Sequence, residues 1–199
     1  MSDRSSRQEE RSATTRRVLL DATISCLVEN GYGGTTGPAV AQKAGLSRGA
    51  QLHHFGTRDQ MVVAAVEHLA QMRMAAVRSR LEEILEGSRT DTRSVPRAAL
   101  ELLAAALSGP LYAATLELWV AARANVELRE ELLPADHRVR AELWEICRCY
   151  VTEDPVAIQM TLDMLLGQGV SGMFDHDRAE LQRHALDRWE RLLGERLSS

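Results

Sequence analysis

The residues best suited to chemistry lie in one short stretch, GLSRGAQLHHFGTR, at positions 45–58. This stretch places two adjacent histidines, His53 and His54, a few residues after Arg48 and Gln51. Imidazole nitrogens can bind a metal or transfer protons, whereas Arg and Gln can pair with the edges of guanine and adenine through two hydrogen bonds. The stretch is therefore either a metal or catalytic site, or a short helix that lies against another molecule.

A metal site is the weaker of these interpretations. Neighbouring positions on a helix point about 100° apart, so His53 and His54 face different directions, and no third ligand is close in sequence. The three cysteines form no metal-spaced cluster, since Cys147 and Cys149 point to different helix faces and Cys26 stands alone. The sequence thus predicts no metal and no cofactor.

Catalysis has little more support from the sequence. No Ser-His-Asp arrangement, carboxylate pair or metal-ligand spacing is present. An all-α small-molecule enzyme is kept as an alternative, in which His68, Glu117, Arg123 or Cys147 would act in a cavity. The sequence favours a protein that is not an enzyme.

Helix caps around the stretch indicate how its side chains are positioned. Thr36 can cap one helix, which Gly45 ends, and Ser47 can cap the next helix over 48–55. A T-x-x-Q capping box at 57–60 starts a further helix. Helix, glycine-containing turn and helix in this order predict a helix-turn-helix, whose second helix can enter the major groove of DNA.

The remainder of the chain also has a helical pattern. Ala and Leu are abundant and aromatic residues reach only 4%, which favours helices over sheets. Residues 1–14 are polar and charged, and we expect them to form a mobile arm. Apolar periodicity predicts an all-α fold of about nine helices; beyond the two short ones, they cover 15–30, 58–86, 95–108, 110–124, 127–150 with an irregularity at Pro134, 155–174 and 177–197.

This pattern divides the chain into the arm, a helix-turn-helix domain over 15–60 and a larger helical domain over 61–199. Residues 1–60 carry eight Lys or Arg against six Asp or Glu, so a basic excess lies at the N-terminal end although the net charge is −4. No apolar signal segment and no run of about eighteen apolar residues occurs. With an odd number of cysteines, we expect a soluble cytoplasmic protein with no membrane partner.

Motifs in the first 60 or so residues resemble those of the TetR family of transcriptional regulators. The first helix ends in ENGY, TT follows, and then comes the pattern AxxAGLSRGxxxxHFxTR. A later segment, ATLELWVAARANVELREEL, is similar to the ligand-binding region of many members. The resemblance implies a homodimeric repressor that binds a palindromic operator in double-stranded DNA and is released by a small-molecule effector. A ligand-independent DNA-binding regulator is a further alternative.

The resemblance also implies roles for single residues. This chain has Leu52 where most members carry a tyrosine that contacts phosphate, and His53 or His54 would substitute for it in part. For His54, packing beside Phe55 is the alternative to DNA contact. By position, Thr36 and Arg58 would bind phosphates, Ser47, Arg48, Gly49, Ala50 and Gln51 would face base edges, and His53 and His54 would lie beside the groove.

The larger domain contains candidates for an effector site. They are apolar and aromatic residues on helices that could surround a cavity, with Arg123 or His68 as a polar anchor. The same residue types at helical spacing can instead fill a core. The candidates are His68, Met72, Leu103, Leu107, Tyr112, Trp119, Arg123, Trp144 and Cys147.

The last two helices are candidates for a dimer interface. Apolar residues run nearly all round 155–174, and two helices from each subunit can form a four-helix bundle. The alternative is that both helices merely cover the core. The candidates are Met160, Met164, Leu165, Gly169, Gly172, Leu186, Trp189 and Leu193.

Overall fold

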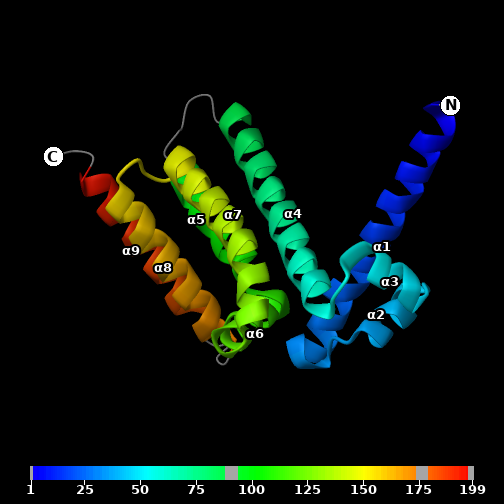
Figure 1. The fold of residues 1–199 in the computed structure, drawn as a ribbon. Helices are drawn as coiled ribbons and strands as arrows, with labels where there is room; N and C mark the ends of the chain where they lie inside the picture. Colours follow the sequence, from blue (N-terminus) through cyan, green and yellow to red (C-terminus); the bar gives the residue numbers. More distant parts are fainter. Residues whose placement is uncertain (1, 88–93, 174–178, 197–199) are drawn as a thin grey trace. The chain divides into compact units, whose positions relative to one another are not determined.

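The computed structural model describes residues 2–87, 94–173 and 179–196. Every regular element in these ranges is an α-helix (Figure 1), which confirms the predicted all-α fold. The helices are α1 (Ser2–Gly34), α2 (Gly37–Ala44), α3 (Arg48–Phe55), α4 (Arg58–Gly87), α5 (Ser94–Ala106), α6 (Gly109–Ala124), α7 (Val126–Tyr150), α8 (Pro155–Gly172) and α9 (Ala179–Arg196).

Side-chain caps begin the two short helices as predicted. The Thr36 hydroxyl accepts the N–H of Ala39 at 3.3 Å, and the Ser47 hydroxyl accepts that of Ala50 at 3.2 Å. Between them Gly45 has φ 64°, the left-handed conformation that a residue without Cβ adopts at little cost. The predicted helix-turn-helix is confirmed.

The N-terminal helix differs from its prediction. Residues 2–14 continue α1 as a helix instead of forming an irregular arm, although residues 6–14 are exposed. Arg, Glu and Gln are good helix formers, and extending a helix costs far less than starting one. The buried segment that contains Leu19 and Leu20 therefore supplies a helix that the polar residues only lengthen. Gly31, with φ 65°, breaks the helical geometry inside α1, where the sequence predicted its end.

The chain forms two compact units, whose boundaries differ from the predicted division near residue 60. The first consists of Met1–Leu69 with Ala114–Asp136, and the second of Ala70–Ala113 with His137–Ser199. α4, α6 and α7 therefore each contribute residues to both units. α7 also continues through Pro134, so the predicted irregularity does not interrupt the helix.

Separate apolar clusters explain these boundaries. In the first unit the helix-turn-helix packs around residues such as Leu19, Val40 and Phe55. A second cluster joins Leu27 to Leu118 of α6. Because α6 and the first part of α7 bury their apolar faces in this unit, they belong to it in spite of their late position in the sequence. The core of the second unit includes Leu81, Leu100, Leu103, Ile146, Ile158 and Leu165.

No single described helix is both long and apolar enough to cross a membrane. Only α5 and α6 taken together reach that length and apolarity, and they are bent by 66° at the break between them. The apolar residues of α5, such as Leu100 and Leu103, are buried in the core of the second unit.

Candidate nucleic-acid interface

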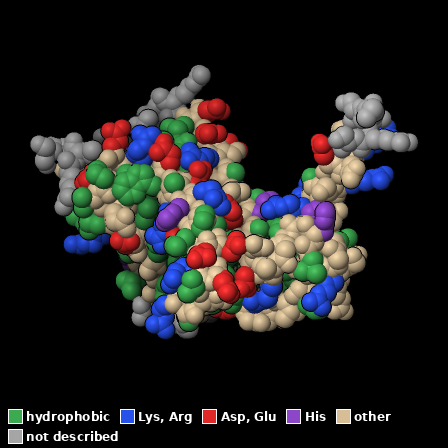
Figure 2. All heavy atoms as spheres, viewed as in Figure 1, with side chains coloured by type: hydrophobic (Ala, Val, Ile, Leu, Met, Phe, Trp, Pro, Cys, Tyr) green, Lys and Arg blue, Asp and Glu red, His purple; other side chains and the backbone are tan. Residues whose placement is uncertain are grey.

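α3 presents two different faces. Arg48, Gly49, Leu52 and His53 are exposed, whereas Phe55 is buried against the core of the first unit. Figure 2 shows histidine at the surface where α3 ends. α3 contains no Asp or Glu. Its exposed N-terminus combines the charge of Arg48 with the backbone at Gly49, which no side chain covers. Such a surface suits a polyanion.

Gln51, predicted to read a base edge, lies on the other face. Its exposed fraction is only 2%. It packs against the start of α2, since a Cβ built on Gly37 would lie 2.7 Å from its Oε1 atom. Gln51 is four residues before Phe55, so both side chains project to the buried side of the helix. In this structure Gln51 is thus packed inside the first unit and not presented to a base edge.

We expect Gln51→Ala to lower the free energy of unfolding by about 1–2 kcal/mol, because it removes a packed side chain and leaves a small void. The pattern of preferred DNA sequences should stay unchanged. Urea denaturation measures the first effect, and selection of bound duplexes measures the second. A changed base preference with unchanged stability would restore the reading role that the sequence predicted.

Arg58, predicted to bind a phosphate, is held inside the first unit. Its Nε donates to the Thr35 carbonyl at 2.5 Å, and its Nη2 donates to the Tyr32 carbonyl. Its guanidinium also lies over the Tyr32 ring, 4.1 Å from the centroid, and pairs with Asp59 at 3.0 Å. These contacts engage all three guanidinium nitrogens within the first unit and neutralise the charge with Asp59. Arg58 thus binds one carbonyl in the last turn of α1 and one just after it, and its phosphate contact stays a prediction.

Glu117 of α6 also binds the end of α1, a positioning role that the sequence did not indicate. Its Oε2 accepts the backbone N–H of Tyr32 at 2.7 Å, and a Cβ on Gly31 would lie 2.7 Å from the same oxygen. Gly31 thus provides both the left-handed turn and the space for the carboxylate. Because 85 residues separate Tyr32 from Glu117, no local pattern could have indicated the contact.

The two histidines of α3 differ in their surroundings. His53 is exposed, whereas His54 is half-buried beside the Phe55 ring, and the Arg16 guanidinium lies 5.1 Å from the centroid of that ring. Burial, followed by the charges of His53 and Arg16, lowers the pKa of His54. A neutral, partly packed His54 fits the packing alternative better than a charged phosphate ligand.

The predicted effector residues differ in their surroundings. Leu103, Leu107 and Cys147 lie in the core of the second unit, where burial raises the pKa of the Cys147 thiol to about 12. Tyr112 is buried there too, and its hydroxyl donates to the Leu166 carbonyl at 3.0 Å. Of the others, Met72 and Arg123 are exposed, and His68, Trp119 and Trp144 are half-buried.

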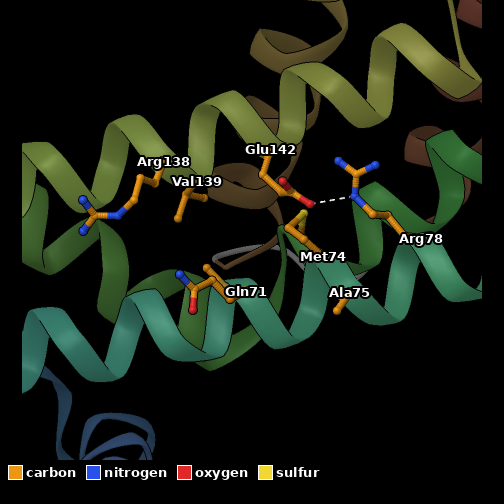
Figure 3. A pocket seen from close by; sticks show the side chains of 8 residues that line it. Gln71, Met74, Ala75, Arg78, Arg138, Val139 and Glu142 are labelled. Atoms are coloured by element: carbon orange, nitrogen blue, oxygen red, sulfur yellow. Dashed lines mark hydrogen bonds and ion pairs between the residues drawn. The ribbon is translucent and has the colours of Figure 1, made fainter.

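A groove of about 290 Å³ in the second unit is lined by other residues, from α4 and α7. Figure 3 shows Gln71 and Met74 of α4 facing Val139 and Glu142 of α7. The Nε atom of Arg78 donates to Glu142 at 2.6 Å, and this bond raises the pKa of Arg78. The groove thus has both apolar and charged side chains in its lining, and none of the predicted effector residues is among them.

Most of the predicted dimer residues face the core of their own subunit. Leu165, Leu186 and Leu193 are buried. Gly169 is buried against Tyr112, and the Trp189 indole N–H donates to Thr161 at 2.8 Å. Met164 and Gly172 are half-buried. Only Met160 of this set is exposed, at 49%. Hydrophobic side chains nevertheless lie at the surface over α8 (Figure 2); the exposed large ones on α8 and α9 are Val156, Met160, Val170, Leu181 and Leu192.

A capped turn followed by an exposed, acid-free second helix defines this chain as a helix-turn-helix protein. The family model "Bacterial regulatory proteins, tetR family" matches residues 19–65. The HTH-type transcriptional regulator CymR of Pseudomonas putida is 30% identical over 171 residues, which are 86% of this chain and 75% of CymR. The chain belongs to the TetR family.

Other similar proteins agree with this assignment. The HTH-type transcriptional regulator BetI of Paraburkholderia phymatum is 33% identical over 110 residues, and the chain spans about half of its length, 52%. The crystal structure of the multidrug binding protein EbrR complexed with imidazole matches with a TM-score of 0.64 and 22% identity, over 87% of this chain and 93% of EbrR. At that identity the match shows the fold. Family membership places the chain among regulators and not among enzymes.

Proposed function

We propose that this protein is a homodimeric repressor that binds a palindromic DNA operator and leaves it when a small molecule binds. The observation that carries the proposal is the exposed face of α3, on which Arg48 and Gly49 follow the cap Ser47. Arginine can bind a guanine edge through two hydrogen bonds, and the free N–H groups of a helix N-terminus attract phosphate. α3 then serves as the recognition helix.

The inward orientation of Gln51 and Arg58 concentrates base reading on few side chains. Among the described residues no ion pair engages Arg48, so its guanidinium is available to DNA. Thr36 is exposed at the start of α2, where its hydroxyl can approach a phosphate while it still caps the helix. A single reading arginine per subunit gives modest affinity, and pairing two subunits multiplies it.

The apolar surface of α8 and α9 supports the homodimer. Val156, Met160 and Val170 follow one exposed side of α8, and Leu181 and Leu192 are exposed on α9. Gly167, also exposed on α8, has open space where a Cβ would be, so a partner helix could approach closely there. A two-fold axis through this surface would pair the same residues of both subunits. The proposed interface therefore consists of these exposed residues, and the predicted interface residues that are buried in the core are left out of it.

The groove between α4 and α7 supports release by a small molecule, since its volume of about 290 Å³ suits a small ligand. α4 and α7 each contribute residues to both units, so a ligand that shifts either helix acts on the unit that contains α3. EbrR, a multidrug binding protein, is an example of the same fold with a bound small molecule. Differential affinity for two arrangements would shift the population away from the DNA-binding one.

The test is selection of bound fragments from genomic DNA, followed by gel shifts on the selected duplexes. We expect a palindromic sequence whose binding weakens steeply with salt, and a subset of small molecules that abolishes it. Absence of specific DNA binding would refute the proposal. Specific binding that no small molecule alters would instead favour a ligand-independent regulator.

Arg48→Ala should weaken binding to the selected operator about 10- to 100-fold and relax the preference at one base position in each half-site, because a bidentate arginine–guanine pair contributes about 1–3 kcal/mol of discrimination. Competition gel shifts against operators changed at single positions measure both effects. Arg129→Ala is the matched control, since it removes an exposed arginine from α7. Equal weakening on every DNA sequence would show that Arg48 binds phosphate only.

A further inference from the structure

Leu52 is an apolar side chain placed in the middle of the exposed face of α3. Its exposed fraction is 46%, whereas the adjacent Gln51 is 2% exposed and Phe55, three residues later, is 6% exposed. α3 therefore buries a polar residue, Gln51, and leaves the apolar Leu52 exposed to solvent. The solvent-facing position of Leu52 follows from its spacing of four residues after Arg48, which puts both on one side of the helix.

The neighbours of Leu52 leave its isobutyl group accessible. Gly49, one turn earlier, carries no side chain, and a Cβ built there would meet only the Ser47 hydroxyl, at 3.7 Å. Arg48 and His53 are exposed on either side. The partner of this face must accept a guanidinium and an imidazole at its margins and an aliphatic group between them.

Duplex DNA offers one apolar group to a helix in its major groove, the C5-methyl of thymine. Phosphates and the other base edges offer only charges, donors and acceptors. Along the helix axis, Leu52 lies about 6 Å from Arg48, which corresponds to roughly two base steps of 3.4 Å. A thymine near the base that Arg48 contacts is therefore within reach of Leu52.

We propose that Leu52 is a specificity residue that contacts the C5-methyl of a thymine in each half-site, roughly two base steps from the base read by Arg48. The inference rests on the proposed function, in which α3 enters the major groove. In this inference Leu52 contacts a base, whereas a tyrosine at the same position would bind a phosphate. We accordingly expect each operator half-site to carry a thymine whose methyl group is needed for full affinity.

The experiment removes single methyl groups from the DNA. Each thymine of the selected operator is replaced in turn by uracil, which keeps every hydrogen-bonding group, and affinity is measured for the wild type and for Leu52→Ala. We expect one uracil position per half-site to weaken wild-type binding about fourfold, the equivalent of about 0.8 kcal/mol for one buried methyl group. Leu52→Ala should bind thymine and uracil operators equally well.

Leu133→Ala is the matched control, because Leu133 on α7 is also a leucine with 46% exposure. This variant should keep the full fourfold preference for thymine. Leu52→Met should retain much of the preference, since it keeps an aliphatic contact. A wild type indifferent to uracil at every position, or a preference that persists in Leu52→Ala, overturns the assignment while operator binding itself stands. Failure of the wild type to bind any operator overturns the proposed function as well.

Discussion

Arg58→Ala should lower the free energy of unfolding of this protein by about 2–4 kcal/mol. The change removes two charge-assisted hydrogen bonds, to the carbonyls of Tyr32 and Thr35, together with the stacking on the Tyr32 ring. It also removes the ion pair of the half-buried Asp59, which keeps the hydrogen bond that the Tyr32 hydroxyl donates to it at 3.0 Å. Urea denaturation followed by circular dichroism measures the loss.

Two further variants separate a structural role of Arg58 from phosphate binding. Arg58→Lys keeps the charge, but a single ammonium cannot reproduce the planar fork, so we expect an intermediate loss of stability. Arg129→Ala, an exposed arginine in the same unit, should change stability by less than about 0.5 kcal/mol. If Arg58→Ala instead kept its stability and reduced the salt dependence of operator binding, Arg58 would be a phosphate ligand, as the family pattern implied.

Local chemistry explains why so much of the helix-turn-helix could be predicted from the sequence. Thr36, Ser47 and Gly45 act on backbone groups three or four residues away, so their types and spacing already specify where α2 ends and α3 begins. The helix ends predicted from α2 onward accordingly lie close to those of the structure. Which side chains of those helices are buried and which are exposed depends on the packing of distant segments.

Gln51 and Glu117 are examples of what the sequence could not indicate. A glutamine on a recognition helix has the right chemistry for adenine, but the space that Gly37 leaves on α2 draws it into the interior. Glu117 meets Tyr32 only because α6 packs on the end of α1 through the cluster of Leu27 and Leu118. In both cases a tertiary contact decided the role of a polar side chain.

Tertiary packing also decides which faces of the apolar helices in the second unit are buried. α8 is apolar nearly all round, so periodicity alone could not distinguish its core face from a face left for a partner. The structure assigns Leu165 and Gly169 to the core, with Gly169 packed against Tyr112. The residues available to a second subunit are the ones that remain exposed, among them Met160 and Val170.

Met160→Asp should convert the proposed dimer to a monomer and weaken binding to the palindromic operator by at least about 100-fold. Placing a carboxylate in an apolar two-fold interface brings two like charges together without water. The loss of the second recognition helix then removes the gain from bivalent binding, which reaches 10²- to 10⁴-fold in general. Light scattering after size exclusion measures the subunit number, and gel shifts measure the affinity.

Met72→Asp is the matched control, because Met72 lies in the same unit and is exposed to 45%, against 49% for Met160. Both substitutions place a charge at a water-accessible position of a helix, so both variants should unfold at nearly the same urea concentration as the wild type. Only Met160→Asp should lose the dimer and the operator. A dimer that survives Met160→Asp and Val170→Asp together would mean that the subunits pair through another surface, whereas loss of the dimer in Met72→Asp would place α4 in the interface.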